Sequence, residues 1–252
     1  MLAQIISSVG IFVFSYLFFV ISERPWAFAL MLALTIASFL LNAFKNQRAF
    51  LVAVFSSHLT LYLLRFIPYG RYWPHDFFIV CAVTFLALKY ILKTPFTKPR
   101  WSWKFTKPEL ISVAIITLPS ILILLWYYSN HREVADKFPL PAMPAWVLPF
   151  AIVGVAAVNG LREELLYRIL YLSTEKAGSK NWFLLFNQAV LFGFLHFAGG
   201  FPQGWLGVLL TGTWGLAIGI QFVLFRSATL SWLTHSLADA IMFSVIVMNR
   251  TV

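Results

Sequence analysis

The sequence has little of what marks a soluble or secreted domain. Only 11% of its 252 residues are charged, whereas a typical soluble domain carries about 25% charged residues. Its single cysteine, Cys81, rules out an intramolecular disulfide. Apolar residues make up 60% of the chain and come in continuous blocks, without the alternation of a half-buried strand. This composition excludes a soluble globular domain and a disulfide-stabilised secreted one.

Several of the apolar blocks reach the roughly 20 residues that a helix needs to cross a bilayer. They lie at 2–22, 26–44, 49–66, 77–92, 110–128, 146–173, 182–200, 205–225 and 229–248. We therefore predict an all-α fold, a polytopic helical bundle of about eight or nine transmembrane spans. The expected location is the cell membrane, or the endoplasmic reticulum in a eukaryote.

The net charge of +10 has a simple explanation in a membrane protein. Lys and Arg collect in cytoplasmic loops, and residues 93–109 hold five of them, so we predict that this loop is cytoplasmic. Gly-rich phosphate loops, RNA-binding aromatic motifs and zinc-finger spacings are missing, and we expect no nucleic-acid partner. The loop 129–145 separates N-terminal spans, residues 1–145, from a C-terminal unit, residues 146–252.

Ionisable residues are concentrated within the apolar segments of the C-terminal unit. At membrane depth each costs several kcal/mol, and such residues normally face the bundle interior and mark a functional site. Because they occur on three apolar segments, we predict one shared site. Its members are Glu163, Glu164, Arg168, His196, His235 and Asp239.

Helical spacing separates the two adjacent glutamates. Glu164 and Arg168 are four residues apart and can form an ion pair along one face. Glu163 is rotated about 100° from Glu164 and stays free to face other helices. His235 and Asp239 are also four residues apart. Span counting places His196 and His235 toward opposite membrane sides, so tilted or broken helices are needed to bring them together.

A free carboxylate near histidines in a low-dielectric bundle is a general-base arrangement. The carboxylate can take a proton from water, one histidine can hold that water, and another can donate to a developing oxyanion. The motifs of competing protease chemistries are absent: H-E-x-x-H, G-x-S-x-G, a Gly-Asp dipeptide and a paired-Cys metal site. This pattern favours a glutamate/histidine hydrolase.

Three ordered motifs resemble those of the CPBP (Abi) family, the intramembrane proteases related to the eukaryotic CAAX prenyl endopeptidase of the Ras-converting type. They are Glu163-Glu164-x-x-x-Arg168, Phe192-x-x-x-His196 and His235-x-x-x-Asp239, within residues 146–248. The resemblance implies a membrane-embedded endopeptidase in which Glu163 activates water and His196 binds it. His235 and Asp239 would support the oxyanion, while Glu164 and Arg168 would be structural or orienting residues.

The resemblance leaves two mechanisms open. We favour a metal-free glutamate mechanism without a cofactor; the alternative is a zinc site whose candidate ligands are Glu163, His196 and His235. Family members often have Asn at the position of Asp239. The carboxylate could be protonated, orient His235 or ligate a metal, and we favour orientation of the imidazole.

The expected substrate is a membrane protein or a lipid-modified peptide, and the bilayer is the other partner. The alternative is a non-catalytic membrane scaffold, or a bacteriocin self-immunity protein with the same fold. A proton-coupled transporter is a third hypothesis, since buried Glu and His can relay protons. It predicts inverted repeats or paired broken helices, and neither is seen in the sequence.

Overall fold

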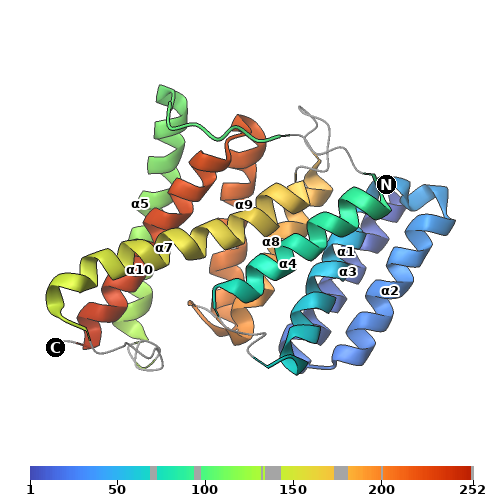
Figure 1. The fold of residues 1–252 in the computed structure, drawn as a ribbon, viewed down its shortest axis with the longest axis horizontal. Coiled ribbons are helices and arrows are strands. Elements are labelled where there is room, and N and C mark those ends of the chain that lie inside the picture. Colours follow the sequence, from blue (N-terminus) through green and yellow to red (C-terminus); the bar gives the residue numbers. More distant parts are fainter. Residues whose placement is uncertain are drawn as a thin grey trace.

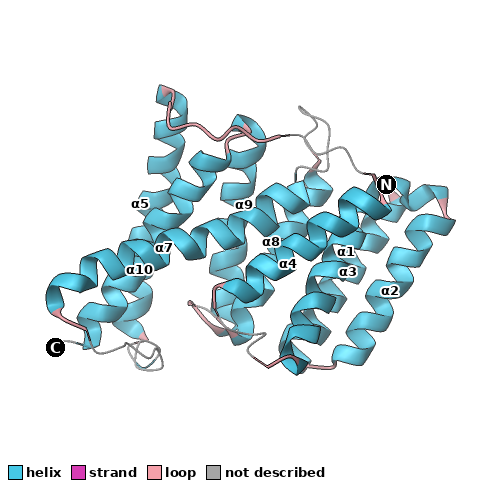
Figure 2. Cartoon of the chain, in the orientation of Figure 1, coloured by secondary structure: helices cyan, strands magenta, loops and turns pink. Residues whose placement is uncertain are grey.

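A computed structural model describes residues 1–68, 73–93, 98–131, 133, 143–172, 181–199 and 201–250. Across these ranges the regular structure is helical, apart from one isolated β-bridge (Figure 2). The predicted all-α fold is confirmed. Most of the connection predicted to separate the two units, and part of the basic loop, lie outside the described residues.

Nine α-helices are present in the described part, several of them extended by 3-10 or π turns. They are α1 (Leu2–Ser15, continued by a π-helix at Tyr16–Ile21), α2 (Arg24–Leu40), α3 (Arg48–Leu63, between 3-10 turns at Asn42–Gln47 and Leu64–Phe66), α4 (His75–Leu86, continued by a π-helix at Ala87–Ile91), α5 (Lys107–Asn130), α7 (Leu148–Glu164, preceded by a 3-10 turn at Ala145–Val147 and continued by a π-helix at Leu165–Leu170), α8 (Trp182–Ala198), α9 (Gly204–Phe225) and α10 (Ala228–Arg250).

The helices have the length and composition of an integral multi-pass membrane protein. Six helical segments of the described chain are long and apolar enough to span a bilayer, and α2 and α8 are shorter apolar helices. Helix α5 shows the pattern most clearly, because Leu110, Ile115, Leu118 and Leu122 are all more than half exposed. An exposed apolar stripe of this length needs lipid around it. The sequence predicts eight or nine spans, and the described residues form nine α-helices. Six of the helical segments are long and apolar enough to span a bilayer.

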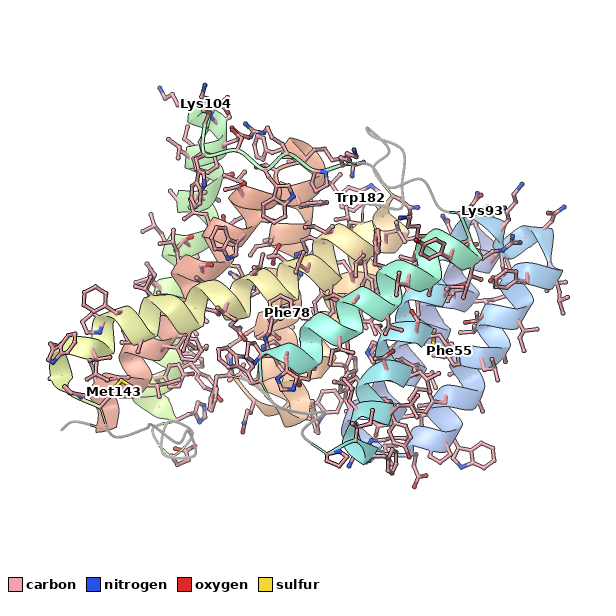
Figure 3. The ribbon with its side chains drawn as sticks, in the orientation of Figure 1. Phe55, Phe78, Lys93, Lys104, Met143 and Trp182 are labelled. Atoms are coloured by element: carbon pink, nitrogen blue, oxygen red, sulfur yellow. The ribbon has the colours of Figure 1, made fainter. Side chains whose placement is uncertain are left out.

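The helices form two groups around α8 and α9 (Figure 1). Helices α1 to α4 lie on one side, and α5, α7 and α10 extend to the other, with α7 running obliquely across the molecule. Lys93, Lys104 and Trp182 lie toward the edge of the molecule where the chain begins, while Met143 lies toward the opposite edge (Figure 3). One apolar core joins Ile11 of α1 to Phe222 of α9, so the N-terminal helices pack directly on the C-terminal ones.

Helices α8 and α9 approach so closely that glycine is required between them. A Cβ built at Gly193 would lie 2.6 Å from the carbonyl oxygen of Val208, and one at Gly219 would lie 2.6 Å from Gln188 Nε2. Gln188 donates across the same interface to the carbonyl oxygen of Gly215 at 3.0 Å. Small residues and buried amides hold membrane helices together in this way.

The basic segment after α4 is fastened to the start of α10. Arg100 donates its backbone N–H to the carbonyl oxygen of Arg226 at 2.7 Å and accepts from Ala228 N at 3.0 Å. Ser102 N donates to Thr229 Oγ1 at 3.0 Å. These bonds fix where α10 begins, and therefore the height at which its polar residues lie.

Candidate active site

The two adjacent glutamates of α7 have different surroundings. Both side chains are buried, with 4% of Glu163 and 1% of Glu164 exposed. Glu163 lines a large cavity. Glu164 Oε2 lies 3.4 Å from Nε of Arg168, which is fully buried. The expected ion pair between Glu164 and Arg168 is therefore present, and Glu163 is the carboxylate that borders open space.

The cavity has a volume of about 670 Å³ and is enclosed mainly by α5, α7, α8, α9 and α10. All four residues predicted to be catalytic line it: Glu163, His196, His235 and Asp239. Most of the remaining wall is apolar. Its α7 part, Leu148 to Val155, precedes Glu163 by about 12–22 Å along the helix, and its α10 part, Met242 to Val247, follows Asp239. The cavity thus joins a polar site to a long apolar limb.

His235 is surrounded by three carboxylates. Its Nδ1 lies 2.8 Å from Glu164 Oε1, and its Nε2 lies 3.5 Å from Glu163 Oε2 and 3.7 Å from Asp239 Oδ2. A carboxylate accepts hydrogen bonds, so we assign the Nδ1 proton to the bond with Glu164. The Trp214 ring packs edge-on against the imidazole, with centroids 4.6 Å apart. With Nδ1 bonded to Glu164, the second ring nitrogen, Nε2, faces Glu163 and Asp239.

His196 is held by its own helix. Its Nδ1 lies 3.0 Å from the carbonyl oxygen of Phe192, which fixes the Nδ1–H tautomer in a neutral ring and leaves Nε2 as an acceptor. The Phe192 ring also contacts both histidines, with centroid distances of 4.9 Å to His196 and 6.1 Å to His235. The two histidines, which span counting separated, therefore meet across one aromatic ring.

Asp239 contacts two polar groups. Its Oδ2 accepts from Asn159 Nδ2 at 2.9 Å and lies 3.7 Å from Nε2 of His235. Because Glu164 takes the Nδ1 position of the imidazole, any orientation of His235 by Asp239 acts through Nε2, and this role stays a prediction.

Asn159, Arg162 and Trp214 line the cavity beside the predicted site residues and were not identified from the sequence. Arg162 Nε donates to Asn159 Oδ1 at 2.9 Å, and its Nη2 lies 3.3 Å from Glu163 Oε1. The spacing of Asn159, Arg162 and Glu163 puts them on one face of a helix, and that pattern could have revealed the first two. Trp214 carries no comparable signal, because one aromatic residue in an apolar helix is unremarkable.

The two histidines have the chemistry that a metal site would use, since each directs one ring nitrogen toward the cavity and bonds the other to an acceptor. The geometry is less suitable. Within the ranges that the structure describes, no three His, Cys, Asp or Glu residues are grouped closely enough to hold an ion. We therefore derive no step through a metal.

A comparison with known proteins identifies a family model that matches part of the chain. Residues 144–241 match the model of a family described as type II CAAX prenyl endopeptidase Rce1-like. No curated protein and no solved structure matches the chain. The matched region contains all three motifs up to Asp239, and it confirms the resemblance inferred from them.

Proposed function

We propose that this protein is an intramembrane endopeptidase that hydrolyses a peptide bond of a membrane-associated or lipid-modified protein. The observation that carries the proposal is the meeting of Glu163, His196, His235 and Asp239 on the wall of one cavity among membrane-spanning helices. The match of residues 144–241 to the CAAX prenyl endopeptidase family supports the same reaction class.

In this proposal Glu163 is the general base and His196 holds the attacking water. The free Nε2 of His196 accepts one hydrogen of the water, and Glu163 accepts the other. The water oxygen then points its lone pair at the substrate carbonyl carbon. As the carbon–oxygen bond forms, the proton passes to Glu163 and the carbonyl oxygen becomes an oxyanion.

In this proposal His235 stabilises that oxyanion. As an imidazolium it would donate from Nδ1 to Glu164 and from Nε2 to the oxyanion. The three surrounding carboxylates compensate the positive charge in the bundle interior. Collapse of the tetrahedral intermediate breaks the carbon–nitrogen bond, and Glu163 returns its proton to the leaving amine. The sequence of proton transfers leaves the enzyme as it began.

The apolar limb supports a substrate with a lipid or membrane-inserted segment. Its wall is formed by aliphatic and aromatic side chains of α5, α7 and α10, including Leu124, Ile152, Met242 and Ile246. Burial of an acyl or prenyl chain contributes roughly 0.8 kcal/mol per CH₂ group. A tethered chain in this limb would bring the adjoining peptide to Glu163.

The test is cleavage of a fluorogenic S-farnesylated peptide by the purified protein in liposomes. Glu163→Gln and His196→Ala should each lower turnover by about 100-fold or more, in the range of general-base catalysis. The matched controls Glu23→Gln and His75→Ala make the same chemical changes at exposed positions that do not line the cavity and should retain turnover.

Two results would contradict parts of the proposal. Turnover that survives both Glu163→Gln and His196→Ala would refute the mechanism, and absence of turnover on every prenylated or membrane peptide would favour a non-catalytic scaffold. A chelator series tests the metal-free mechanism. Loss of turnover with a chelator, restored by zinc alone, would replace it with the zinc mechanism.

A further inference from the structure

The helix ends lie at two opposite edges of the molecule. Lys93, Lys104 and Trp182 lie at one edge, which we call the basic edge, and Met143 lies at the opposite edge (Figure 3). The described helices alternate in direction between these edges (Figure 1). The turn from α9 to α10 is at the basic edge, because Arg100, four residues before Lys104, bonds to its backbone. Each described connection can therefore be assigned to one edge.

The two edges differ in charge. Lys and Arg collect on the cytoplasmic side of membrane proteins, so we assign the cytoplasm to the edge that holds more of them. Among the described residues at helix ends and connections, the basic edge has Lys45, Arg48, Lys89, Lys93, Lys98, Arg100, Lys104, Lys107 and Arg226, and the opposite edge has Arg24, Arg65 and Arg250. The opposite edge then faces away from the cytoplasm.

The cavity extends from the catalytic carboxylate to the opposite edge. On α7 its wall runs from Glu163 back to Leu148, a distance of about 22 Å along the helix. Four residues of connections also line it, and all four lie at the opposite edge: Trp73, Met143, Phe201 and Pro202. None of the described connection residues at the basic edge belongs to the wall.

Toward the basic edge the described residues close the site. Beyond Glu163 on α7, the side chains of Tyr167, Arg168 and Tyr171 are at most 1% exposed. Before His235 on α10, the residues that face this layer are equally buried: Leu230, Ser231 and Thr234. Water that enters from the basic edge would have to cross this packed layer to reach the carboxylate.

The apolar wall alone would also suit a cavity that opens sideways to lipid. Such an opening admits an acyl or prenyl chain, but it supplies no water to Glu163, and hydrolysis consumes one water for each bond cut. The connection residues in the wall bring the end of the cavity to the edge of the molecule, where water is present. An aqueous opening at that edge meets both needs.

We propose that the cavity is reached from the side of the membrane away from the cytoplasm, and that the substrate is a membrane-anchored protein whose cleaved segment lies on that side. The inference rests on the proposed function and narrows its substrate class. A protein that is anchored in the cytoplasmic leaflet, with its chain in the cytoplasm, would meet the closed layer instead of the cavity.

The test is labelling of single cysteines by a charged, membrane-impermeant methanethiosulfonate in right-side-out and inverted membrane vesicles. The native thiol is first removed by Cys81→Ala. Val155→Cys places a thiol on the cavity wall. Its matched control is Val153→Cys on the same helix, at a position that is 62% exposed and does not line the cavity. Glu23→Cys and Lys98→Cys report the opposite and basic edges.

A charged reagent crosses the hydrocarbon core slowly, so Val155→Cys should react about tenfold or more faster in right-side-out vesicles than in inverted ones. Glu23→Cys should show the same preference, Lys98→Cys the reverse, and Val153→Cys should stay unlabelled in both. Faster labelling of Val155→Cys in inverted vesicles would overturn the inference, as would its failure to react in either while the edge cysteines react. Labelling of Lys98→Cys from outside would also overturn it.

Cleavage then tests the side of the substrate. A peptide with a lipid anchor and a charged fluorogenic segment is added to the outside of both kinds of vesicle. Right-side-out vesicles should cleave it about tenfold or more faster, and permeabilisation with detergent should remove the difference. Faster cleavage by inverted vesicles would overturn the inference. If neither kind cleaves it even after detergent, the proposed function fails, and the labelling of Val155→Cys still decides where the cavity opens.

Discussion

The substitution Glu164→Gln should strongly destabilise the fold, whereas Glu163→Gln should mainly abolish the reaction and lower the stability much less. Gln is nearly isosteric with Glu, and its side-chain oxygen can still accept from Nδ1 of His235. The change therefore removes the negative charge of Glu164 and little else. What remains is the guanidinium of Arg168, which is 0% exposed.

The size of the expected loss of stability follows from the surroundings of the Arg168 guanidinium. Its three nitrogens have no hydrogen-bond partner among the described residues, and Glu164 supplies its ion pair at 3.4 Å. Removing one partner of a buried pair typically costs about 3–5 kcal/mol. For a chain of this size that corresponds to a fall in Tm of roughly 6–20 °C. Arg162, which loses its pair in Glu163→Gln, keeps its bond to Asn159 and is partly exposed, so we expect about 1 kcal/mol there.

The assay is thermal unfolding of the purified variants in detergent, followed by turnover of the folded fraction. Arg168→Met in the Glu164→Gln background removes the orphaned charge and should restore at least half of the lost stability, because an apolar replacement of a buried ion pair is often neutral. The reasoning fails if Glu163→Gln is destabilised as much as Glu164→Gln, or if the double variant is no more stable than Glu164→Gln.

Two further predictions concern helix packing and the site. Gly207→Ala should lower the stability by about 1–3 kcal/mol, because the new Cβ would lie 2.4 Å from the carbonyl oxygen of Pro202. Gly154→Ala should raise the stability by about 0.5–1 kcal/mol, because its Cβ would meet nothing within 4 Å. Thermal unfolding measures both changes, and equal effects would refute the packing argument. Asp239→Asn should retain at least tenfold more turnover than Asp239→Ala. The Asn side chain can still accept the hydrogen bond from Asn159, whereas Ala leaves that amide without its partner. The peptide assay measures both turnovers, and similar losses in both would show that the charge itself is required.

Local pattern was enough to predict the helices and the division between the two glutamates. Apolar blocks give spans because a bilayer requires internally satisfied backbone, and the 100° step between neighbours separates Glu163 from Glu164. These features depend on a few neighbouring residues, which is the range over which sequence is informative.

Contacts between distant helices could not be predicted in the same way. The meeting of His196 on α8 with His235 on α10, on either side of the Phe192 ring, joins two helices that are separated by α9 in the sequence. The pairing of Arg100 with the start of α10 joins segments more than 120 residues apart. The contact of His235 with Glu164 at 2.8 Å, shorter than its contact with Asp239 at 3.7 Å, also joins two helices that are distant in sequence.

The buried pair and the catalytic carboxylate are linked by their adjacency in the chain. Glu164 contacts Arg168 on its own helix and His235 on α10, and the contact with α10 opposes rotation of α7 about its axis. Turning the helix by about 100° would carry Glu164 toward the cavity and take Arg168 with it, because both lie on one continuous helix. That state would leave His235 without its Nδ1 acceptor. The non-reacting glutamate thus determines which carboxylate meets the substrate, and this is why its loss should reduce stability and turnover together.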